Sequence, residues 1–439
     1  MRPLWMTVLL IACSGDKVQT EGMNPGECSD GADNDGDGDY DCNDEDCSGA
    51  PDCEDDEDTD TGEEDTNNPD TDDTDDQAQS DVDHKIIAYF AEWGVYGRDY
   101  HVGDIPASQV THVMYAFSNP TADGVCEVYD PWASLELNGG SLYLLEDLKT
   151  THPHLKTLIS LGGWTLSGHF SAIAADPVKR SNFVDSCVEF MLTYGFDGID
   201  VDWEYPVGGG LQAGIPEDKE NYTLLLSEFR TKLDQLDPNY LLTIAAPAGA
   251  TTIPNMDLPH LADHLDWINI MTYDFHGPWE SSTNHHAPLY PNSTQPDDNN
   301  VDTAVQTYLD AGVPAEKLIL GVPFYGKTWS GVSGGDGLFQ AATDSGPGNY
   351  EDGTMDYHHI VDTYLSNSSY TRYWDEESMV PYIHSEEEGI FITYDDPESM
   401  QIKVDFILEK GLGGAMFWEL SGDTQSQALG SVLANGLLD

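Results

Sequence analysis

Apolar runs of strand length recur along the chain from residue 84 to its end. They are rich in β-branched and aromatic residues and cover 86–90, 112–117, 155–163, 196–203, 241–247, 266–273, 318–324 and 413–420. Helix-like stretches lie between several of them, for example at 178–195 and 219–236. Eight strands that alternate with helices predict an α/β fold, a (β/α)8 TIM barrel over residues 84–439. A doubly wound open sheet is the alternative architecture.

One connection in this pattern is unusually long. About seventy residues separate the seventh strand from the helix-like stretch at 400–411, which is far more than a normal loop contains. We therefore expect a small inserted subdomain at the barrel mouth, over about 327–389.

The fourth predicted strand carries a row of acidic residues. In FDGIDVDWEYP, residues 196–206, side chains alternate between the two faces of the strand, so Asp200, Asp202 and Glu204 share one face. The carboxyl ends of barrel strands form the active site, and Glu204 is the outermost of the three. Carboxylates this close together cannot all ionise, so one of them stays protonated and can act as a general acid. Metal binding is the competing use, but no histidine joins the row and one strand encircles a cation poorly.

The first 83 residues differ in composition from the rest of the chain. Residues 1–13 hold one basic residue, a short apolar run and Cys13, and LIAC resembles the lipobox of bacterial lipoproteins. We expect an export signal with a lipid on Cys13 that anchors the protein to a membrane; an ordinary secretory signal is the alternative. Residues 54–83 are almost wholly polar and very acidic, so they are expected to form an extended, disordered linker.

Between these two segments, residues 14–53 are rich in cysteine and aspartate. Four of the seven cysteines lie within residues 28–53, a spacing that favours disulfides in an exported chain. The aspartates resemble the opening of an EF-hand loop and the short repeats of thrombospondin type 3. The candidate calcium ligands are Asp33, Asp35, Asp37, Asp39 and Asp44; a disulfide-stapled acidic spacer is the alternative. Cys126 and Cys187 either pair or remain buried thiols.

The net charge of the chain limits the kinds of molecule that it can bind. It carries 81 acidic and only 16 basic residues, for a formal net charge of -65. Such a surface repels nucleic acid and anionic lipid, so a neutral or cationic substrate is favoured.

Several segments resemble motifs of glycoside hydrolase family 18, and they lie at matching strand positions. DGIDVDWE, 197–204, matches the DxxDxDxE signature of that family. SLGGW at 160–164, MTYD at 271–274 and GGAMFWEL at 413–420 are similar to its third-, sixth- and eighth-strand motifs. The stretch YFAEWGVYGRDY looks most like bacterial chitinases with a deep cleft. The resemblance covers about 85–436 and implies a barrel with an α+β insertion between strands seven and eight.

The resemblance also implies a substrate-assisted, retaining mechanism, in which the N-acetyl oxygen of the sugar attacks the anomeric carbon. Glu204 would protonate the leaving oxygen and later activate water. Asp202 would bind the acetamido N–H, Asp200 would share a proton with Asp202, and Tyr273 would hold the acetamido oxygen. No cofactor is implied for catalysis. The spacing of alternate strand residues, about 6.5 to 7 Å, by itself leans towards inversion.

The same motifs imply a set of binding residues. Indole rings stack on the apolar faces of sugars, and Trp418 would form the floor of the subsite that holds the distorted sugar. The implied substrate-binding residues are Trp418, Trp164, Trp279, Trp93, Asp274, Tyr89 and Ser160, of which Tyr89 and Ser160 would also satisfy the buried Asp200. Lys327 stands where the family commonly has arginine, which leaves that contact open. His285 and His286 lack metal-ligand spacing and are interpreted as loop residues.

Three functions compete at this point. The first is a chitinase that cleaves β-1,4-linked N-acetylglucosamine polymers and is expected to act within the polymer rather than from its ends. The second is an enzyme of the same family acting on peptidoglycan or an N-glycan core. The third is a chitin-binding lectin without activity, although such lectins lose acids that are present here. The protein is expected to be an exported monomer.

Overall fold

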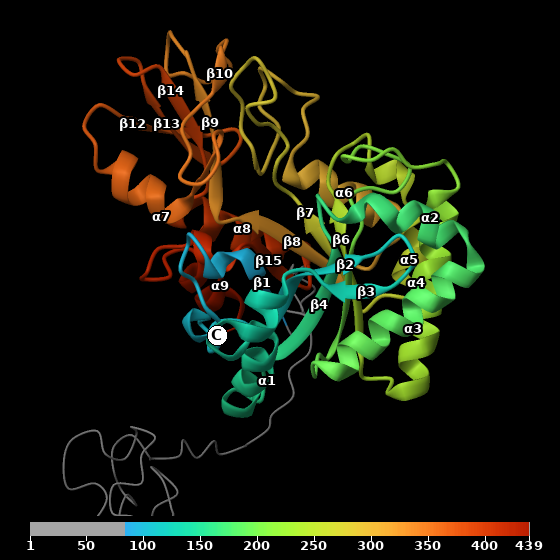
Figure 1. The fold of residues 1–439 in the computed structure, drawn as a ribbon. Coiled ribbons are helices and arrows are strands. Elements are labelled where there is room, and N and C mark those ends of the chain that lie inside the picture. The colour runs from blue at the N-terminus through green and yellow to red at the C-terminus, as the bar shows by residue number, and fades with distance from the viewer. Residues whose placement is uncertain (1–83, 439) are drawn as a thin grey trace, which may run out of the picture. The chain divides into compact units, whose positions relative to one another are not determined.

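In the computed structural model, which describes residues 84–438, eight parallel strands close into a barrel. They follow the order β1-β15-β8-β7-β6-β5-β4-β2, and pairing of β1 with β2 completes the circle (Figure 1). The strands are β1 (Lys85–Ala91), β2 (His112–Pro120), β4 (Lys156–Gly162), β5 (Gly198–Asp202), β6 (Leu241–Pro247), β7 (Trp267–Met271), β8 (Leu318–Pro323) and β15 (Gly414–Trp418). The predicted (β/α)8 barrel is confirmed, and the open sheet is excluded.

Helices cover the outside of the barrel strands (Figure 1). They are α1 (Ser141–Thr151), α2 (Phe170–Ala175), α3 (Pro177–Thr193), α4 (Asp218–Leu236), α5 (Leu258–Ala262), α6 (Val301–Asp310), α8 (Pro397–Lys410) and α9 (Gly430–Leu437). Local sequence explains where they begin. Asp176 caps α3 by accepting from the backbone N–H groups of Val178 and Lys179, and proline occupies the first helical position.

The long connection after β8 forms a second, antiparallel sheet. Its strands are β9 (Tyr325–Ser330), β10 (Asp344–Ser345), β11 (Thr354–Asp356), β12 (Thr371–Asp375), β13 (Val380–Ser385) and β14 (Ile390–Thr393), with the short helix α7 (Tyr357–His359). A separate apolar cluster of Trp329, Val332, Tyr382 and Phe391 packs inside this unit. The sheet therefore extends slightly beyond 327–389 at both ends, because β9 pairs directly with β14.

Arg98, in the segment after β1, joins this second sheet to the barrel. Its guanidinium lies 3.3 Å from Asp356 of β11 and 3.4 Å from Glu419, the residue after β15. It also lies 4.1 Å from the ring centre of Tyr350. One cation thus holds together three segments that are far apart in sequence.

Cys126 and Cys187 form a disulfide, which settles the question that the sequence left open. The bond links β3 (Cys126–Val128), a short strand paired with β2, to the middle of α3. Within residues 84–438, no helix has the length and apolar character that crossing a membrane requires.

Candidate active site

The predicted carboxylate row lies on β5 and the residue that follows it. All five residues of β5 are buried, with Asp200 and Asp202 only 0% and 4% exposed. Ile199 and Val201 point the other way and join the apolar core. The two-residue period of the strand thus separates the acids from the core, as predicted.

Asp200 is held by donors from four other strands. Tyr89 (2.8 Å) and Ser160 (2.7 Å) donate to its Oδ2, and Thr243 (2.7 Å) and Asn269 (3.4 Å) donate to its Oδ1. Burial raises the pKa of Asp200, and these hydrogen bonds oppose the rise. Both oxygens are satisfied, so this carboxyl group is fixed in place.

Asp202, in contrast, is not fully hydrogen-bonded. Its Oδ1 is buried and has no hydrogen-bond partner among the described residues. Burial raises the pKa of Asp202 well above its usual range, and the charges of Glu204 and Asp200 raise it further. A protonated carboxyl with a free oxygen can turn towards a new partner.

Glu204 comes two residues after Asp202 and is partly exposed. Burial raises its pKa to about 7, contact with the Tyr205 hydroxyl opposes the rise, and the charge of Asp274 adds to it. Ser167 donates to the carbonyl of Asp202 (3.2 Å) and accepts from the N–H of Glu204 (2.9 Å). The sequence analysis missed Ser167, because nothing in the pattern marks one serine of the loop after β4.

Tyr273 and Asp274 follow β7 at the same end of the barrel. Burial raises the pKa of Tyr273 well above its usual range, and the charge of Asp202 is the next cause. The Tyr273 hydroxyl lies 3.8 Å from the sulfur of Met416. It therefore remains a neutral donor near the carboxylates of β5.

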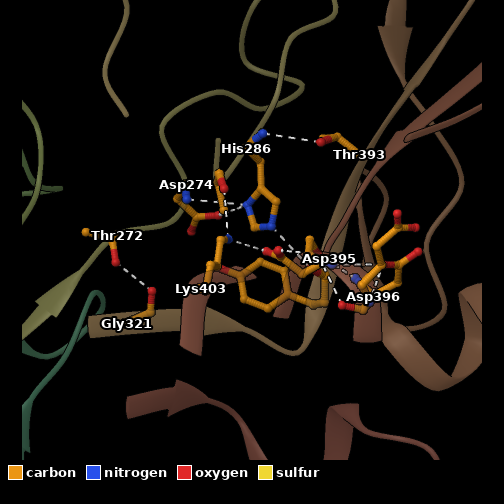
Figure 2. Close-up of polar contacts among 12 residues, drawn as sticks. Thr272, Asp274, His286, Gly321, Thr393, Asp395, Asp396 and Lys403 are labelled. Atoms are coloured by element: carbon orange, nitrogen blue, oxygen red, sulfur yellow. Dashed lines mark hydrogen bonds and ion pairs between the residues drawn. The ribbon is translucent and has the colours of Figure 1, made fainter. Parts of the chain in front are cut away.

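Asp274 belongs to a polar cluster that reaches the second sheet (Figure 2). Its Oδ1 lies 3.2 Å from the Lys327 ammonium and 3.4 Å from Nδ1 of His286. Although burial alone would raise it, the charge of Lys327 and a hydrogen bond from the Tyr325 hydroxyl hold the pKa of Asp274 well below its usual range. Lys327, whose contact was left open, therefore pairs with an ionised Asp274.

His285 and His286 lie outside helices and strands, as interpreted, but each is only 1% exposed. His285 lies 2.9 Å from a carboxylate oxygen of Asp375, and His286 contacts Asp274. Both are thus packed between the barrel and the second sheet. The sequence missed this burial because the partners follow or precede them by many residues.

The predicted aromatic residues divide into two groups. The Trp418 ring lies 5.5 Å from Tyr89, 6.0 Å from Trp93 and 5.8 Å from Phe117, and so forms the centre of a cluster. The exposed members of the set are Trp93 (38%), Trp164 (47%) and Trp279 (61%). Exposed indole rings give a surface on which sugar rings can stack.

No group of three or more potential metal ligands occurs among residues 84–438. The predicted calcium ligands, Asp33, Asp35, Asp37, Asp39 and Asp44, lie outside the described residues, as do Cys13 and the acidic segment 54–83.

Comparison with known proteins agrees with the motifs. The model of the family described as glycosyl hydrolases family 18 matches residues 85–423. Chitinase A1 of Niallia circulans is 43% identical over 401 residues, which cover 79% of this chain but only 57% of that protein. Endochitinase 1 of Metarhizium robertsii is 38% identical, covering 77% of this chain and 81% of that protein.

Solved structures give the same result. Chitinase ChiA74 from Bacillus thuringiensis superposes with a TM-score of 0.75 at 39% identity, over 81% of this chain and 70% of that chain. The predicted family is therefore confirmed, and the chain belongs to glycosyl hydrolase family 18, a family of glycoside hydrolases.

Proposed function

We propose that this chain is a chitinase that hydrolyses β-1,4-linked N-acetylglucosamine polymers, with Glu204 as general acid and base. The proposal rests on the difference in exposure between Glu204, which follows β5, and the two acids within that strand. Glu204 has a pKa of about 7 and is partly exposed, whereas Asp200 and Asp202 are buried. A general acid works best when its pKa lies near the working pH and its proton can reach the leaving oxygen.

We propose that the reaction is substrate-assisted and retains the anomeric configuration. Asp200 is saturated with four donors and cannot turn, whereas Asp202 has a free buried oxygen. Asp202 is therefore the group that accepts the acetamido N–H and stabilises the positive charge that develops there. Tyr273, a neutral donor, holds the acetamido oxygen, which then acts as an intramolecular nucleophile of high effective concentration.

The aromatic residues supply the binding surface in this proposal. Trp418 forms the floor of the subsite at the scissile bond, Trp93 extends the cleft on one side, and Trp164 and Trp279 extend it on the other. Asp274, kept ionised by Lys327, accepts a hydrogen bond from the sugar. The related chitinases and endochitinases support chitin as the substrate.

Product analysis tests this mechanism. NMR of freshly cleaved chitooligosaccharide should show the β-anomer, and a thiazoline mimic of the intermediate should inhibit. Fully deacetylated chitosan should resist cleavage, because it lacks the acetamido nucleophile. An initial α-anomer, or fast cleavage of deacetylated oligomers, would contradict substrate assistance. Cleavage of peptidoglycan or an N-glycan core in preference to chitin would contradict the proposed substrate.

We further propose that the protein is exported as a monomer with a lipid on Cys13, and that residues 33–44 bind calcium without altering catalysis. Mass spectrometry of the mature N-terminus tests the lipid, and light scattering tests the monomer. Calorimetry of the full chain with calcium tests the third point; an absence of measurable affinity would remove the calcium site.

A further inference from the structure

His286 closes the loop that carries Trp279. Its carbonyl accepts the backbone N–H of Phe275 at 3.0 Å, and its Nδ1 lies 3.4 Å from the backbone N of Asp274. The ring is 1% exposed and lies between Asp274 and the second sheet (Figure 2). One histidine therefore contacts both residues at the start of this loop, through its backbone and its side chain.

The contacts of the ring define which nitrogen carries the proton. Nε2 lies 3.2 Å from the carbonyl oxygen of Tyr325, and a carbonyl only accepts, so Nε2 carries a hydrogen. In the neutral ring Nδ1 then accepts, and the backbone N–H of Asp274 lies 3.4 Å from it. In the charged ring Nδ1–H would instead point to the Asp274 carboxylate, 3.4 Å away.

Charged groups around the ring have opposing effects on its protonation state. Burial lowers the pKa of His286; Asp274 raises it, Lys327 of β9 lowers it, and Asp395 before α8 raises it. Thr393 of β14 contributes a neutral hydroxyl, which accepts from the backbone N of His286 at 3.4 Å. Lys327 already pairs with the Asp274 carboxylate and neutralises its charge. A second positive charge on His286 would therefore gain little stabilisation, so the neutral ring is favoured.

A buried ion pair fixes the chain beside His286. Lys403 of α8 is fully buried, donates to the carbonyl of Ala287 at 2.9 Å and pairs with Asp395 at 2.7 Å. Ser399 donates to the other oxygen of Asp395 at 2.7 Å. The ion pair of Lys403 and Asp395, drawn in Figure 2, thus links α8 to the residue that follows His286.

Asp274 needs such support because of its backbone. It has a φ of 56°, in the left-handed region that non-glycine residues occupy at a cost. Its carboxylate meets Lys327, and its charge contributes to the raised pKa of Glu204. A change in the backbone of Asp274 would therefore move its carboxylate and alter the pKa of Glu204.

We propose that neutral His286 is a positioning residue, whose Nδ1 accepts the backbone N–H of Asp274 and so holds the Asp274 carboxylate against Lys327 and in electrostatic reach of Glu204. This inference rests on the proposed function, because it takes Glu204 as the general acid.

The state of the ring can be measured without any activity assay. In the full chain with ¹⁵N-labelled histidine, long-range ¹H–¹⁵N NMR at pH 7 should show His286 as the neutral Nε2–H tautomer. The signal is assigned by its loss in His286→Asn. An imidazolium, or the Nδ1–H tautomer, would overturn the proposal even if the protein is an active chitinase.

Two substitutions separate positioning from packing. His286→Asn can place an amide oxygen near the position of Nδ1, so kcat on a chitooligosaccharide should stay within about threefold of the wild type. His286→Leu removes the acceptor and leaves a buried N–H unsatisfied, which should lower kcat by about 10- to 100-fold. It should also shift the basic limb of the pH profile to lower pH, since Asp274 would no longer support the pKa of Glu204.

His285→Asn is the matched control, because His285 is equally buried but contacts Asp375 instead of Asp274. It should leave the basic limb where it is. Equal losses in His286→Asn and His286→Leu, or an unmoved limb in His286→Leu, would overturn the proposal. If His286→Leu does not fold, the NMR measurement decides. A wild type without activity on chitooligosaccharides would contradict the proposed function but not the tautomer.

Discussion

Glu204 lies at the partly exposed end of a buried row of carboxylates, beyond Asp200 and Asp202. Each acid in the row is desolvated, and the repulsion between neighbouring charges favours the protonated forms. Protons in such a row belong to the group rather than to one residue. The site therefore holds an acid ready to donate at neutral pH.

Replacement of Glu204 by glutamine should lower kcat by about 10²- to 10⁴-fold, because the amide cannot donate a proton to the leaving oxygen. Ligand affinity and the melting temperature should change little, since the amide has nearly the same shape. Kinetics on a chitooligosaccharide and a thermal melt check this. Glu220→Gln, an exposed change on α4, is the control. Turnover near that of the wild type would remove Glu204 from its assigned role.

The pH dependence of activity should follow Glu204. Its pKa is raised to about 7, so the protonated form that donates persists up to that pH and is lost above it. We expect kcat to fall as the pH rises through about 7, by tenfold per pH unit at the alkaline end. A pH profile of kcat measures this. A decline that begins near about 4.3, the ordinary value for glutamate, would contradict it.

At the scale of elements, the barrel depends on a few long-range links in addition to its core. The Cys126–Cys187 disulfide joins β3 to α3 and closes a loop of 61 residues. A cross-link of this kind stabilises a protein mainly by restricting the unfolded chain.

The double substitution Cys126→Ser with Cys187→Ser should lower the free energy of unfolding by about 2–4 kcal/mol. Denaturant unfolding under oxidising conditions measures the change, and wild type in reductant is the matched comparison. The kcat of the folded variant should be that of the wild type. An unchanged unfolding midpoint would show that the disulfide adds no stability.

At the scale of the whole molecule, the acidic excess is not confined to the N-terminal segments. Residues 84–439 contain 52 of the acidic residues and 14 of the basic ones. Most of these cations contact a carboxylate or a carbonyl oxygen, for example Lys149 with Asp197 and Lys410 with Asp302. The remaining carboxylates repel one another and oppose the compact state.

Added salt should therefore stabilise the protein. The range of charge interactions falls from about 30 Å at 0.01 M salt to about 10 Å at 0.1 M, so repulsion across the surface is screened. The melting temperature at pH 7 should rise as NaCl increases over this range and beyond. At pH 4, where many carboxylates are protonated, the rise should be smaller. A melting temperature that falls with NaCl at pH 7 would contradict this prediction.

The sequence by itself determined the barrel and the place of its acids. The strand period and the succession of strands along the chain can be read locally, so eight apolar runs and the alternation in FDGIDVDWEYP sufficed to place Asp200 and Asp202 on one face of β5 and Glu204 just beyond its end. The long connection after the seventh strand likewise predicted a second unit, because no loop of that length is needed to join neighbouring strands.

Only the tertiary structure decided how these residues are held. The donors to Asp200 include Thr243 and Asn269, which no sequence motif identifies, and they meet Asp200 because of the register between β5, β6 and β7. Packing of the second sheet against the barrel places Lys327 on Asp274 and buries His286 beside it. Such contacts depend on the register between strands and on packing between units, and no local pattern of apolar and polar residues records either.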